Sequence, residues 1–461
     1  MTRPLVMKFG GTSVAGVTAM SNVVRIVRGS VRDSRPILVV VSAMSGVTDA
    51  LLAACAAARD GSIESVERHI ADLESRHLAV VKQLFAATPT AEAVGNEVVR
   101  MFLELRGVLT SVAILQELTP RGADRVTAAG ELLSSRIVAA LLTESGLPAR
   151  WIDARRAVVT DASFGAALPD LPATAITAAR EIGPAWEAGA IAVAGGFVGA
   201  TAEGITTTLG RGGSDVSAAV FGSALDAEEI QIWTDVDGML TADPRVIADA
   251  QPVGRLSFDE AAELAYFGAK VLHPSTILPA VEKNIPVRIL NTMRPASPGS
   301  LITAEGGVDG RPLTAIACKR NVTVVNVTST RMLHAHGFLH KVFEVFERHA
   351  TSVDVVTTSE VSVSMTLDDD SRIEAIARDL EGCGSVQVER GMAIVSAVGD
   401  NLRADPSSAV SVIAALGRLP LRMVSQAASR RNVTVVLSDA DVPAAMTRLH
   451  AAFFSMDEVR R

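Results

Sequence analysis

The 461-residue sequence has few cysteines and no long apolar run, and each absence excludes a class of protein. Its three cysteines, Cys55, Cys318 and Cys383, are odd in number and far apart. We therefore expect free thiols in a reducing compartment, and neither a disulfide framework nor a zinc site. No stretch reaches the roughly 18 consecutive apolar residues that span a membrane, and the N-terminus enters an apolar segment without a basic leader. We expect no membrane span and no secretory signal.

Aromatic residues and basic clusters are also scarce. Aromatic residues make up 4% of the chain, the formal net charge is −8, and no Lys/Arg block is long enough to follow a nucleic-acid backbone. We therefore expect no nucleic-acid partner and a cytoplasmic location. The Walker A pattern G-x-x-x-x-G-K-[ST] is absent, and so are the H-R-D and D-F-G sequences of protein kinases. Both of these nucleotide-binding classes are excluded.

The first part of the chain has the pattern of an α/β domain. Short apolar runs alternate with amphipathic stretches over residues 4–290, which is typical of helices packed on a largely parallel sheet. Charged residues spread over an apolar periodicity predict a helical excursion at residues 62–118, outside the sheet. Turn-forming residues follow, so we predict a first domain over 1–292 and a linker over 293–312. The clearest strands are expected at 36–41, 190–194 and 229–233.

The remaining chain repeats one pattern of strands and helices. Two units with the order β-α-β-β-α-β are predicted, as in ferredoxin-like domains. The second unit runs out of chain before a fourth strand, and a spare strand lies upstream at residues 313–319. We expect this strand to cross over, so that 320–390 form one unit and 313–319 plus 391–461 form the other. The strands of the two units are expected at 323–327, 353–356, 361–365, 393–398, 422–426 and 433–437. Their helices are expected at 337–349, 372–380, 409–416 and 442–453.

The segment Met7-Lys8-Phe9-Gly10-Gly11-Thr12-Ser13 ends the first apolar strand and has the residues of a phosphate site. Glycines let backbone N–H groups approach an anion, a helix N-terminus favours negative charge, and Lys8 adds a full positive charge. Thr12 and Ser13 are expected to cap a helix that follows at about residues 16–28. A tight strand-to-helix turn without a ligand is the alternative.

Further segments with chemical side chains follow predicted strands or begin predicted helices, where an open α/β sheet binds its ligands. Each of them alone has a simpler explanation. Glu131 suits the first turn of any helix, and residues 243–245 suit a plain turn. The segments are residues 42–48, 129–133, 206–215, 233–238, 243–245 and 267–270.

Together and in this order, these segments resemble the aspartate kinases of the amino acid kinase family, over the whole chain. The two C-terminal units resemble the paired ACT domains of the monofunctional, lysine-sensitive members. The residues that carry the resemblance are Lys8–Ser13, Gly130-Glu131, Thr208–Asp215, Trp233–Gly238 and Phe267–Pro274. The resemblance implies an amino acid kinase fold followed by two ferredoxin-like βαββαβ ACT domains.

The implied reaction transfers the ATP γ-phosphate to the β-carboxylate of L-aspartate, giving 4-phospho-L-aspartate. This is the first step of lysine, threonine and methionine biosynthesis. ATP and Mg²⁺ are the implied cofactors, with magnesium held mainly by the ATP phosphates and no protein metal site. Because an aspartate side chain is ionised at neutral pH, the chemistry needs no general base. It needs positioning and neutralisation of charge on the transferred group.

The resemblance also implies roles for individual residues. Lys8 and Asp215 are the expected catalytic pair, with Lys8 neutralising the phosphoryl charge. Arg211 suits a bidentate grip on the substrate α-carboxylate, and Glu131 suits its α-ammonium. Other substrate contacts are expected from Ser45, Thr48 and Ser214. Nucleotide contacts are expected from Lys8, Gly10, Gly11, Ser13, Thr234, Asp235, Leu240, Arg245 and Lys270. Leu240 departs from many relatives, which have an aromatic residue there that stacks on adenine.

The first C-terminal unit resembles an effector site for L-lysine. Gly337 opens a helix whose N-terminal amides can take a carboxylate, and Asp354 can pair with an ammonium group. The expected effector residues are Met332, Gly337, Phe338, Leu339, Val353, Asp354, Thr358 and Ser359. The alternative for the apolar members is that they are core residues. The resemblance further implies a homodimer through the ACT domains.

Two other functions remain open at this point. One is a related kinase of the same superfamily that phosphorylates another carboxylate. The other is an amino-acid sensor that keeps the fold without turnover.

Overall fold

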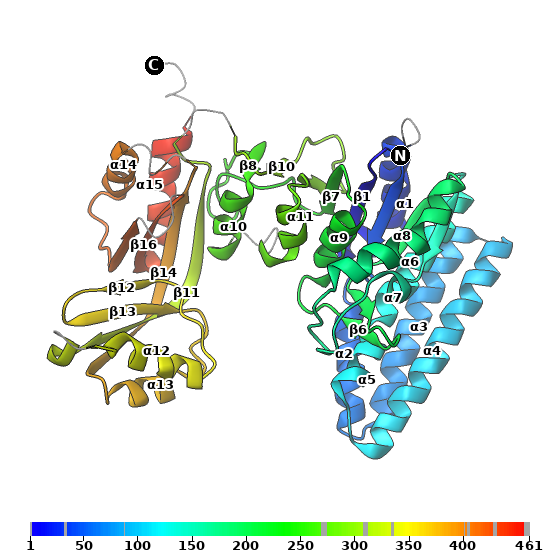
Figure 1. Ribbon diagram of the computed structural model, residues 1–461, viewed down its shortest axis with the longest axis horizontal. Coiled ribbons are helices and arrows are strands. Elements are labelled where there is room, and N and C mark those ends of the chain that lie inside the picture. Colours follow the sequence, from blue (N-terminus) through cyan, green and yellow to red (C-terminus); the bar gives the residue numbers. More distant parts are fainter. Residues whose placement is uncertain are drawn as a thin grey trace. The chain divides into compact units, whose positions relative to one another are not determined.

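The computed structural model describes residues 2–31, 35–86, 88–268, 274–307, 312–332, 336–400, 402, 406–426 and 431–455. The chain divides into two compact units, each of which is described by itself. Unit 1 comprises Met1–Met239 and Leu272–Ala304, and unit 2 comprises Leu240–Val271 and Glu305–Arg461. Figure 1 shows the elements of both units.

Unit 1 is built on a largely parallel sheet, as predicted. Strand β1 (Leu5–Phe9) lies inside it, between β2 (Ile37–Val41) and β7 (Glu229–Thr234), and pairs parallel with both. All residues of β1 and β2 are buried, because such strands are covered on both faces. The strands of unit 1 follow the order β3-β4-β2-β1-β7-β9-β10. The bounds of the others are Ala149–Ile152 (β3), Ile191–Gly195 (β4), Val287–Asn291 (β9) and Ser300–Thr303 (β10).

Helices cover this sheet, and a short ribbon of β5 (Val198–Ala200) and β6 (Thr206–Thr208) lies apart from it. Helices α3 and α4 lie side by side, which confirms the predicted helical excursion (Figure 1). The α-helices of unit 1 are α1 (Val17–Ser30), α2 (Val47–Arg59), α3 (Ile63–Phe85), α4 (Pro89–Leu115), α5 (Pro120–Thr127), α6 (Ala129–Glu144), α7 (Ala154–Ala157), α8 (Leu171–Glu187), α9 (Gly213–Ala224) and α11 (Leu278–Glu282). Its 3₁₀ turns are η1 (Gly11–Val14) and η2 (Pro274–Ile277).

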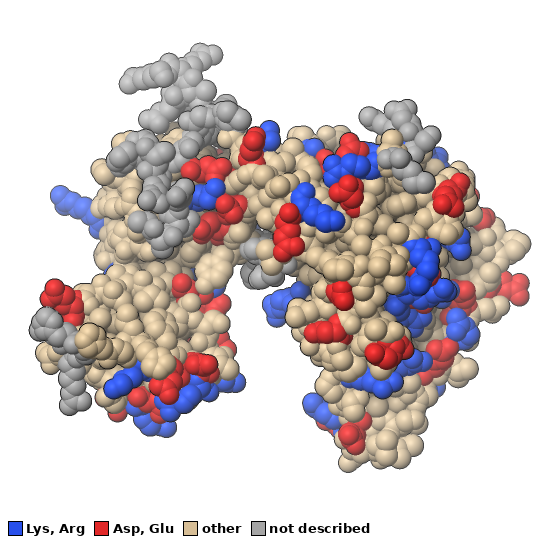
Figure 2. Space-filling view, viewed as in Figure 1, with Lys and Arg blue, Asp and Glu red and all other residues tan. Residues whose placement is uncertain are grey.

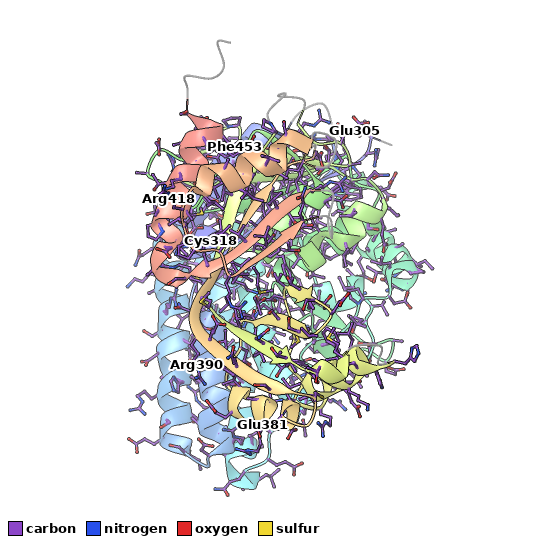
Figure 3. All side chains as sticks on the ribbon, turned by 90° about the vertical axis from the view of Figure 1, so that its left-hand side faces the viewer. Glu305, Cys318, Glu381, Arg390, Arg418 and Phe453 are labelled. Carbon is purple, nitrogen blue, oxygen red and sulfur yellow. The ribbon has the colours of Figure 1, made fainter. Side chains whose placement is uncertain are left out.

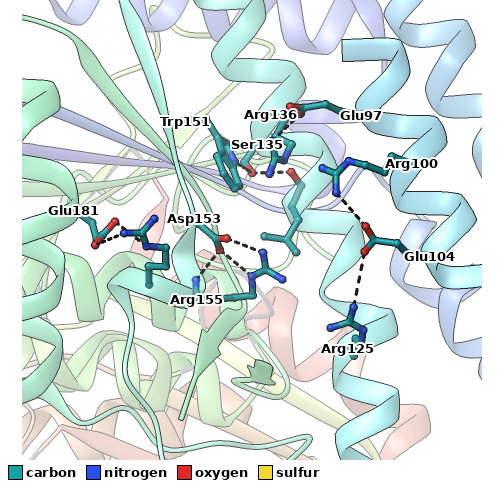
Figure 4. Close-up of polar contacts among 12 residues, drawn as sticks. Glu97, Arg100, Glu104, Arg125, Ser135, Arg136, Trp151, Asp153, Arg155 and Glu181 are labelled. Carbon is teal, nitrogen blue, oxygen red and sulfur yellow. Dashed lines mark hydrogen bonds and ion pairs between the residues drawn. The ribbon is translucent and has the colours of Figure 1, made fainter. Parts of the chain in front are cut away.

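Helix α6 is fixed on two sides by polar contacts (Figure 4). The Trp151 indole N–H donates to Ser135 Oγ at 2.9 Å, which ties β3 to the helix. The Arg136 guanidinium lies 3.6 Å from the centre of the Trp151 ring and donates to Glu97 of α4 at 2.7 Å. Among the described residues, the helical stretch Pro120–Glu144 is apolar and long enough to cross a membrane. However, 83% of its most apolar part is buried inside the protein, as in a core helix.

Unit 2 contains one antiparallel sheet with the order β12-β13-β11-β14-β16-β15. Its strands are β11 (Ala315–Thr328), β12 (Val356–Thr358), β13 (Ser362–Leu367), β14 (Ser385–Val398), β15 (Met423–Gln426) and β16 (Asn432–Ser438). Its other elements are β8 (Arg255–Ser257), α10 (Phe258–Tyr266), η3 (Thr330–Met332), α12 (Phe338–Arg348), α13 (Ile373–Leu380), α14 (Pro406–Leu416), η4 (Asp439–Asp441) and α15 (Val442–Phe454).

The two strands expected at 313–319 and 323–327 form one continuous strand, β11. Its first part, from Ala315 to Lys319, pairs with β14, and its second part pairs with both β13 and β14. The register shifts after Lys319, where Asn321 has a φ of 58°, a conformation that asparagine tolerates better than most residues. In Figure 3, Cys318 lies midway along the sheet, with Arg390 and Glu381 toward one end and Phe453 toward the other.

One strand expectation in unit 2 is wrong. A strand was expected at 353–356, but β12 begins only at Val356. Asp354 and Val355 both bond the backbone of the single residue Thr366, so the pairing is irregular before Val356. The Thr366 hydroxyl also accepts from the Val355 N–H at 2.8 Å. All three cysteines are free, as predicted.

On the face shown in Figure 2, basic side chains lie beside acidic ones, in keeping with ion pairs such as Arg106–Glu67.

The described residues 240–268 belong to the same unit as the C-terminal region. Ala242 and Ile247 belong to the same apolar core as Ile316, Val395 and Leu449. This segment lies inside the range 1–292 expected for the first domain, and the domain limits stay a prediction.

Candidate active site

A pocket of about 670 Å³ lies in unit 1, where β1 and β2 end and α2, α6 and α9 begin. This volume suits a small-molecule ligand, and the carboxyl ends of parallel strands are where open α/β sheets bind theirs. The pocket brings together eight of the residues singled out in the sequence: Lys8, Gly11, Ser45, Thr48, Glu131, Arg211, Ser214 and Asp215.

The charged centre of the pocket is an ion pair. Lys8, the fourth residue of β1, is 8% exposed, and its Nζ lies 2.5 Å from Asp215 Oδ1 in the first turn of α9. The side chain of Asp215 is 18% exposed, so water screens this pair little. A compact, oriented ammonium group is thus held at the pocket wall.

Two glycines allow the chain to approach this centre. Gly212 begins α9 with a φ of 70°, which disfavours other residues, and a Cβ there would lie 2.8 Å from Thr276 Cγ2. A Cβ on Gly11 would lie 3.0 Å from the Ala43 carbonyl oxygen. Glycine at position 11 keeps the segment after β1 close to the segment after β2, and glycine at position 212 lets the start of α9 pack against η2.

Glu131 is a buried carboxyl group with an unused oxygen. It lies in the first turn of α6 and is 4% exposed, and its Oε2 has no hydrogen-bond partner among the described residues. Burial raises the pKa of the Glu131 carboxyl to about 8, although the N–H groups of Ala43 and of Glu131 itself oppose this shift. A cationic ligand in the pocket would complete the environment of this carboxyl.

The other expected substrate residues lie around the same pocket. Arg211 is exposed in the loop before α9, and Ser214 is half-buried in its first turn. Thr48 lies in the first turn of α2, and Ser45 is exposed before that helix. The Ser45 carbonyl accepts from Arg76 at 2.8 Å, which holds its backbone in place.

The segment after β1 differs from the expectation. Thr12 and Ser13 do not cap α1: they lie in the 3₁₀ turn η1, and α1 begins after Gly16 without a side-chain cap. The extra turn separates the glycines from the helix. Ser13 is 2% exposed, and its hydroxyl lies 2.6 Å from Thr292 Oγ1. Gly10 and Ser13 are not among the pocket-lining residues.

The expected nucleotide residues are spread over both units. Thr234 ends β7 in unit 1, and its hydroxyl donates to Asp235 at 3.1 Å. Leu240 and Arg245 belong to unit 2, where the exposed Arg245 guanidinium is bonded to the Asp243 carboxylate at 2.6 Å. Lys270 lies outside the described residues.

The expected effector residues lie in unit 2. Phe338 belongs to an apolar core, against which Met332 and Val353 pack. Gly337 precedes α12 with a φ of 78°, and Leu339 is 40% exposed. Thr358 and Ser359 are exposed.

Asp354 already has partners in this structure. Its Oδ1 accepts from the Tyr266 hydroxyl at 2.8 Å, and its Oδ2 lies 2.9 Å from Lys319 Nζ.

Asp124 and Phe197 are among the pocket residues that the sequence analysis did not single out. Asp124 lies on α5 and is 2% exposed. Phe197 adopts a φ of 64°, which is rare for a bulky residue, and follows Gly196. The glycine pair Gly195-Gly196 is a turn signal that could have drawn attention to Phe197, whereas nothing near Asp124 distinguished it from a surface helix.

The described residues contain no group of three or more His, Cys, Asp or Glu side chains that could hold a metal ion. The carboxylate of Asp215 lines the pocket, and Mg²⁺ commonly binds through one or two carboxylates plus substrate phosphates, so the pocket fits a magnesium ion that nucleotide phosphates would carry.

Models of two protein families match this chain. A model of the amino acid kinase family matches residues 3–291, and a model of the ACT domain matches residues 395–453. Aspartokinase 3, chloroplastic, of Arabidopsis thaliana is 40% identical over 98% of this chain and 82% of its own length. Lysine-sensitive aspartokinase 3 of Escherichia coli is 37% identical over 98% of this chain and 100% of its own.

Two solved structures of E. coli aspartokinase III are similar to the whole chain. The complex with lysine and aspartate (T-state) superposes with a TM-score of 0.83, and the complex with aspartate and ADP (R-state) with 0.81. Each is 34% identical and covers 98% of this chain and 100% of the solved one.

Proposed function

The chain belongs to the amino acid kinase family as an aspartokinase, and from this premise we propose that it phosphorylates the β-carboxylate of L-aspartate with ATP. The products are 4-phospho-L-aspartate and ADP. The observation that carries the proposal is the buried Glu131, whose unpartnered oxygen and raised pKa suit a cationic group in the pocket. An α-ammonium is such a group.

The chemistry needs no proton transfer. An oxygen of the ionised β-carboxylate attacks the γ-phosphorus, a new P–O bond forms, and the bond to the bridging oxygen of ADP breaks. The difficulty is bringing one anion onto another. Lys8, oriented by Asp215, supplies the positive charge for the transferred group, and the N–H group of Gly11 assists it. The Gly10 N–H instead donates to the Trp233 carbonyl at 3.1 Å.

The substrate backbone is held at two charged points. Arg211 binds the α-carboxylate in a bidentate manner, and Glu131 binds the α-ammonium. Hydrogen bonds from Ser45, Thr48 and Ser214 complete the grip. All five side chains line the same pocket, which supports this division of roles.

ADP in a similar solved structure supports the use of ATP. We assign the nucleotide to Ser13, Thr234, Asp235, Leu240, Arg245 and Lys270. The Ser13 hydroxyl already contacts Thr292, so we assign Ser13 the role of holding the backbone of its own turn in place. A magnesium ion bound to the ATP phosphates would neutralise part of their negative charge.

Regulation by L-lysine is part of the proposal, because a lysine-sensitive relative matches over nearly the whole chain. Asp354 takes the effector ammonium and the N-terminal amides of α12 take its carboxylate. Met332, Phe338, Leu339, Val353, Thr358 and Ser359 form the remaining contacts. We further propose a homodimer through the ACT domains and a cytoplasmic location.

A hydroxamate assay tests these proposals. The enzyme is incubated with ATP, magnesium, L-aspartate and hydroxylamine, which traps the acyl phosphate, while ADP release is followed in parallel. Aspartate-dependent hydroxamate that L-lysine suppresses and L-threonine does not would support both reaction and effector. ADP release without hydroxamate would contradict the acceptor, and activity that is indifferent to lysine would contradict the effector.

A further inference from the structure

Asp124 is a buried carboxylate that joins two loops of the pocket. Its Oδ2 accepts from the backbone N–H groups of Thr208 at 2.9 Å and of Gly165 at 3.0 Å. Its Oδ1 accepts from the Thr208 hydroxyl at 2.7 Å. Both oxygens are therefore engaged by donors within the protein, so Asp124 does not need a ligand to satisfy it.

The partners of Asp124 fix the start of the loop that carries Arg211. Thr208 is the last residue of β6, three positions before Arg211. Gly210 follows with a φ of 73°, and a Cβ on it would lie 3.2 Å from the Gly165 carbonyl oxygen. The Arg211 loop is thus packed against the Gly165 loop, and Asp124 is bonded to both.

On its other side, Asp124 is rigidly connected to Glu131. Helix α5 leads through Ala128 into α6, since the Ala128 N–H donates to the Asp124 carbonyl at 3.0 Å and the Leu132 N–H donates to the Ala128 carbonyl at 3.2 Å. Asp124 and Glu131 thus lie on two consecutive helices without an extended linker. A displacement of Asp124 relative to Thr208 would change the span between Glu131 and Arg211.

We propose that Asp124 is a positioning residue that sets the span between Glu131 and Arg211, and thereby selects the α-ammonium and α-carboxylate of the amino-acid substrate. The inference rests on the proposed function, in which these two residues grip the substrate. It predicts a defect in binding of the amino acid and not of the nucleotide, which a purely structural carboxylate would not produce selectively.

The test compares two neighbouring threonines of β6. Thr208→Val removes the hydroxyl bond to Asp124 and keeps the backbone bond, so the fold is retained. Thr207→Val is the matched control, because the equally buried Thr207 hydroxyl contacts Thr160 Oγ1 at 2.7 Å and not Asp124. Thr208→Ser keeps the hydroxyl bond to Asp124 and should therefore keep the wild-type KM for aspartate. Asp124→Ala, which removes the acceptors of all three bonds, gives the stronger perturbation.

KM for aspartate and for ATP is measured in the hydroxamate assay, with thermal melting to verify folding. Thr208→Val is expected to raise KM for aspartate about tenfold and to change KM for ATP less than about twofold, with Thr208→Ser and Thr207→Val close to wild type. Equal effects of the two valine variants, or equal effects on both substrates, would overturn the inference. A wild-type enzyme without aspartate-dependent hydroxamate would instead overturn the proposed function.

Discussion

Lys8 Nζ and Asp215 Oδ1 lie 2.5 Å apart, joining the buried end of β1 to the first turn of α9. Asp215 orients the ammonium group and offsets the cost of burying it. Its position at a helix N-terminus also stabilises its own charge. Lys8 and Asp215 carry opposite charges, so the pair has no net charge before the nucleotide binds. The buried ammonium group is therefore not isolated while it waits for the phosphates.

Breaking this pair should impair the chemical step. We expect Lys8→Met to lower kcat by about 10²–10³-fold, the usual loss when one group that stabilises transition-state charge is removed. Asp215→Asn keeps the shape and should lower kcat by about 10²-fold. The rate of hydroxamate formation is measured at saturating ATP and aspartate. Lys283→Met, which alters a lysine bonded to the Ser223 carbonyl away from the pocket, is the control. An Asp215→Asn variant with unchanged kcat would reduce the pair to a packing contact.

The raised pKa of Glu131 predicts a pH dependence of aspartate binding. The free enzyme holds this carboxyl protonated below about pH 8, whereas an ammonium ligand needs it ionised. The kcat/KM for aspartate should therefore rise with pH up to about 8 and then level off, because this ratio reports the free enzyme. Glu131→Gln should bind aspartate weakly and lose this rise. A wild-type profile that is flat from pH 6 to about 8 would contradict the assignment of Glu131 to the ammonium.

The same group should make the ligand-free protein less stable as pH rises. In the unfolded chain the pKa of Glu131 is the ordinary 4.5 of a glutamate, and in the folded chain its pKa is about 8. Between these values the folded state binds more protons, so the free energy of unfolding falls with pH. We expect Glu131→Gln to melt at a higher temperature than wild type at pH 8.5, with a smaller difference at pH 5. Differential scanning calorimetry without substrates measures both, and an equal difference at the two pH values would contradict this linkage.

Much of the pocket could be predicted from the sequence, because its residues follow strands that the apolar pattern identifies. Lys8, Glu131 and Asp215 each lie at the end of a strand or in the first turn of a helix. The topology of an α/β sheet brings such positions to one edge. Asp124 could not be found in this way, because its role depends on Thr208 and Gly165, which only the folded chain brings near it.

The errors in the sequence analysis have a common physical origin. Thr12 and Ser13 have the side chains of helix caps, but the chain forms a 3₁₀ turn first and α1 begins after Gly16. The strand expected at 353–356 has suitable β-branched residues, yet Asp354 and Val355 both bond the single residue Thr366, and regular pairing begins only at Val356. In both cases a tertiary contact or an added turn overrides local propensity.

Arg211 should determine the affinity for aspartate and leave that for ATP largely unchanged. Its guanidinium is exposed beside the pocket, and a planar fork of donors matches a carboxylate better than an ammonium does. We expect Arg211→Ala to raise KM for aspartate by about 10²-fold, and Arg211→Lys by roughly tenfold, in line with the loss of charged hydrogen bonds. KM for ATP, measured on the same variants, is the internal control. A matching rise in KM for ATP would refute the division of the site into a substrate half and a nucleotide half.

Lysine inhibition should depend on Asp354, whose side chain is 4% exposed and already engaged by Lys319 and Tyr266. Lys319 Nζ also lies 2.9 Å from Asp368 Oδ2, which provides a matched control. Asp354→Asn and Asp368→Asn each remove one carboxylate from Lys319, but only the first removes the proposed partner of the effector. We expect Asp354→Asn to raise the half-inhibitory lysine concentration at least about tenfold, corresponding to about 1.4 kcal/mol, and Asp368→Asn less than about threefold. Equal shifts would assign the effect to Lys319 itself.

Tyr266 offers a separate test of how lysine binding at Asp354 affects the rest of unit 2. Its hydroxyl joins Asp354 to the last residue of α10, and Gly268, two residues on, is packed so closely on the Cys318 carbonyl that no Cβ would fit. An effector that draws Asp354 toward its own ammonium must weaken the bond to Tyr266, because both compete for the same carboxylate. We therefore expect Tyr266→Phe to bind lysine with near wild-type affinity by calorimetry but to be inhibited less at saturation. Full inhibition of Tyr266→Phe by lysine would show that the effect of lysine binding is not transmitted through α10. Loss of lysine binding in this variant would instead make Tyr266 part of the effector site.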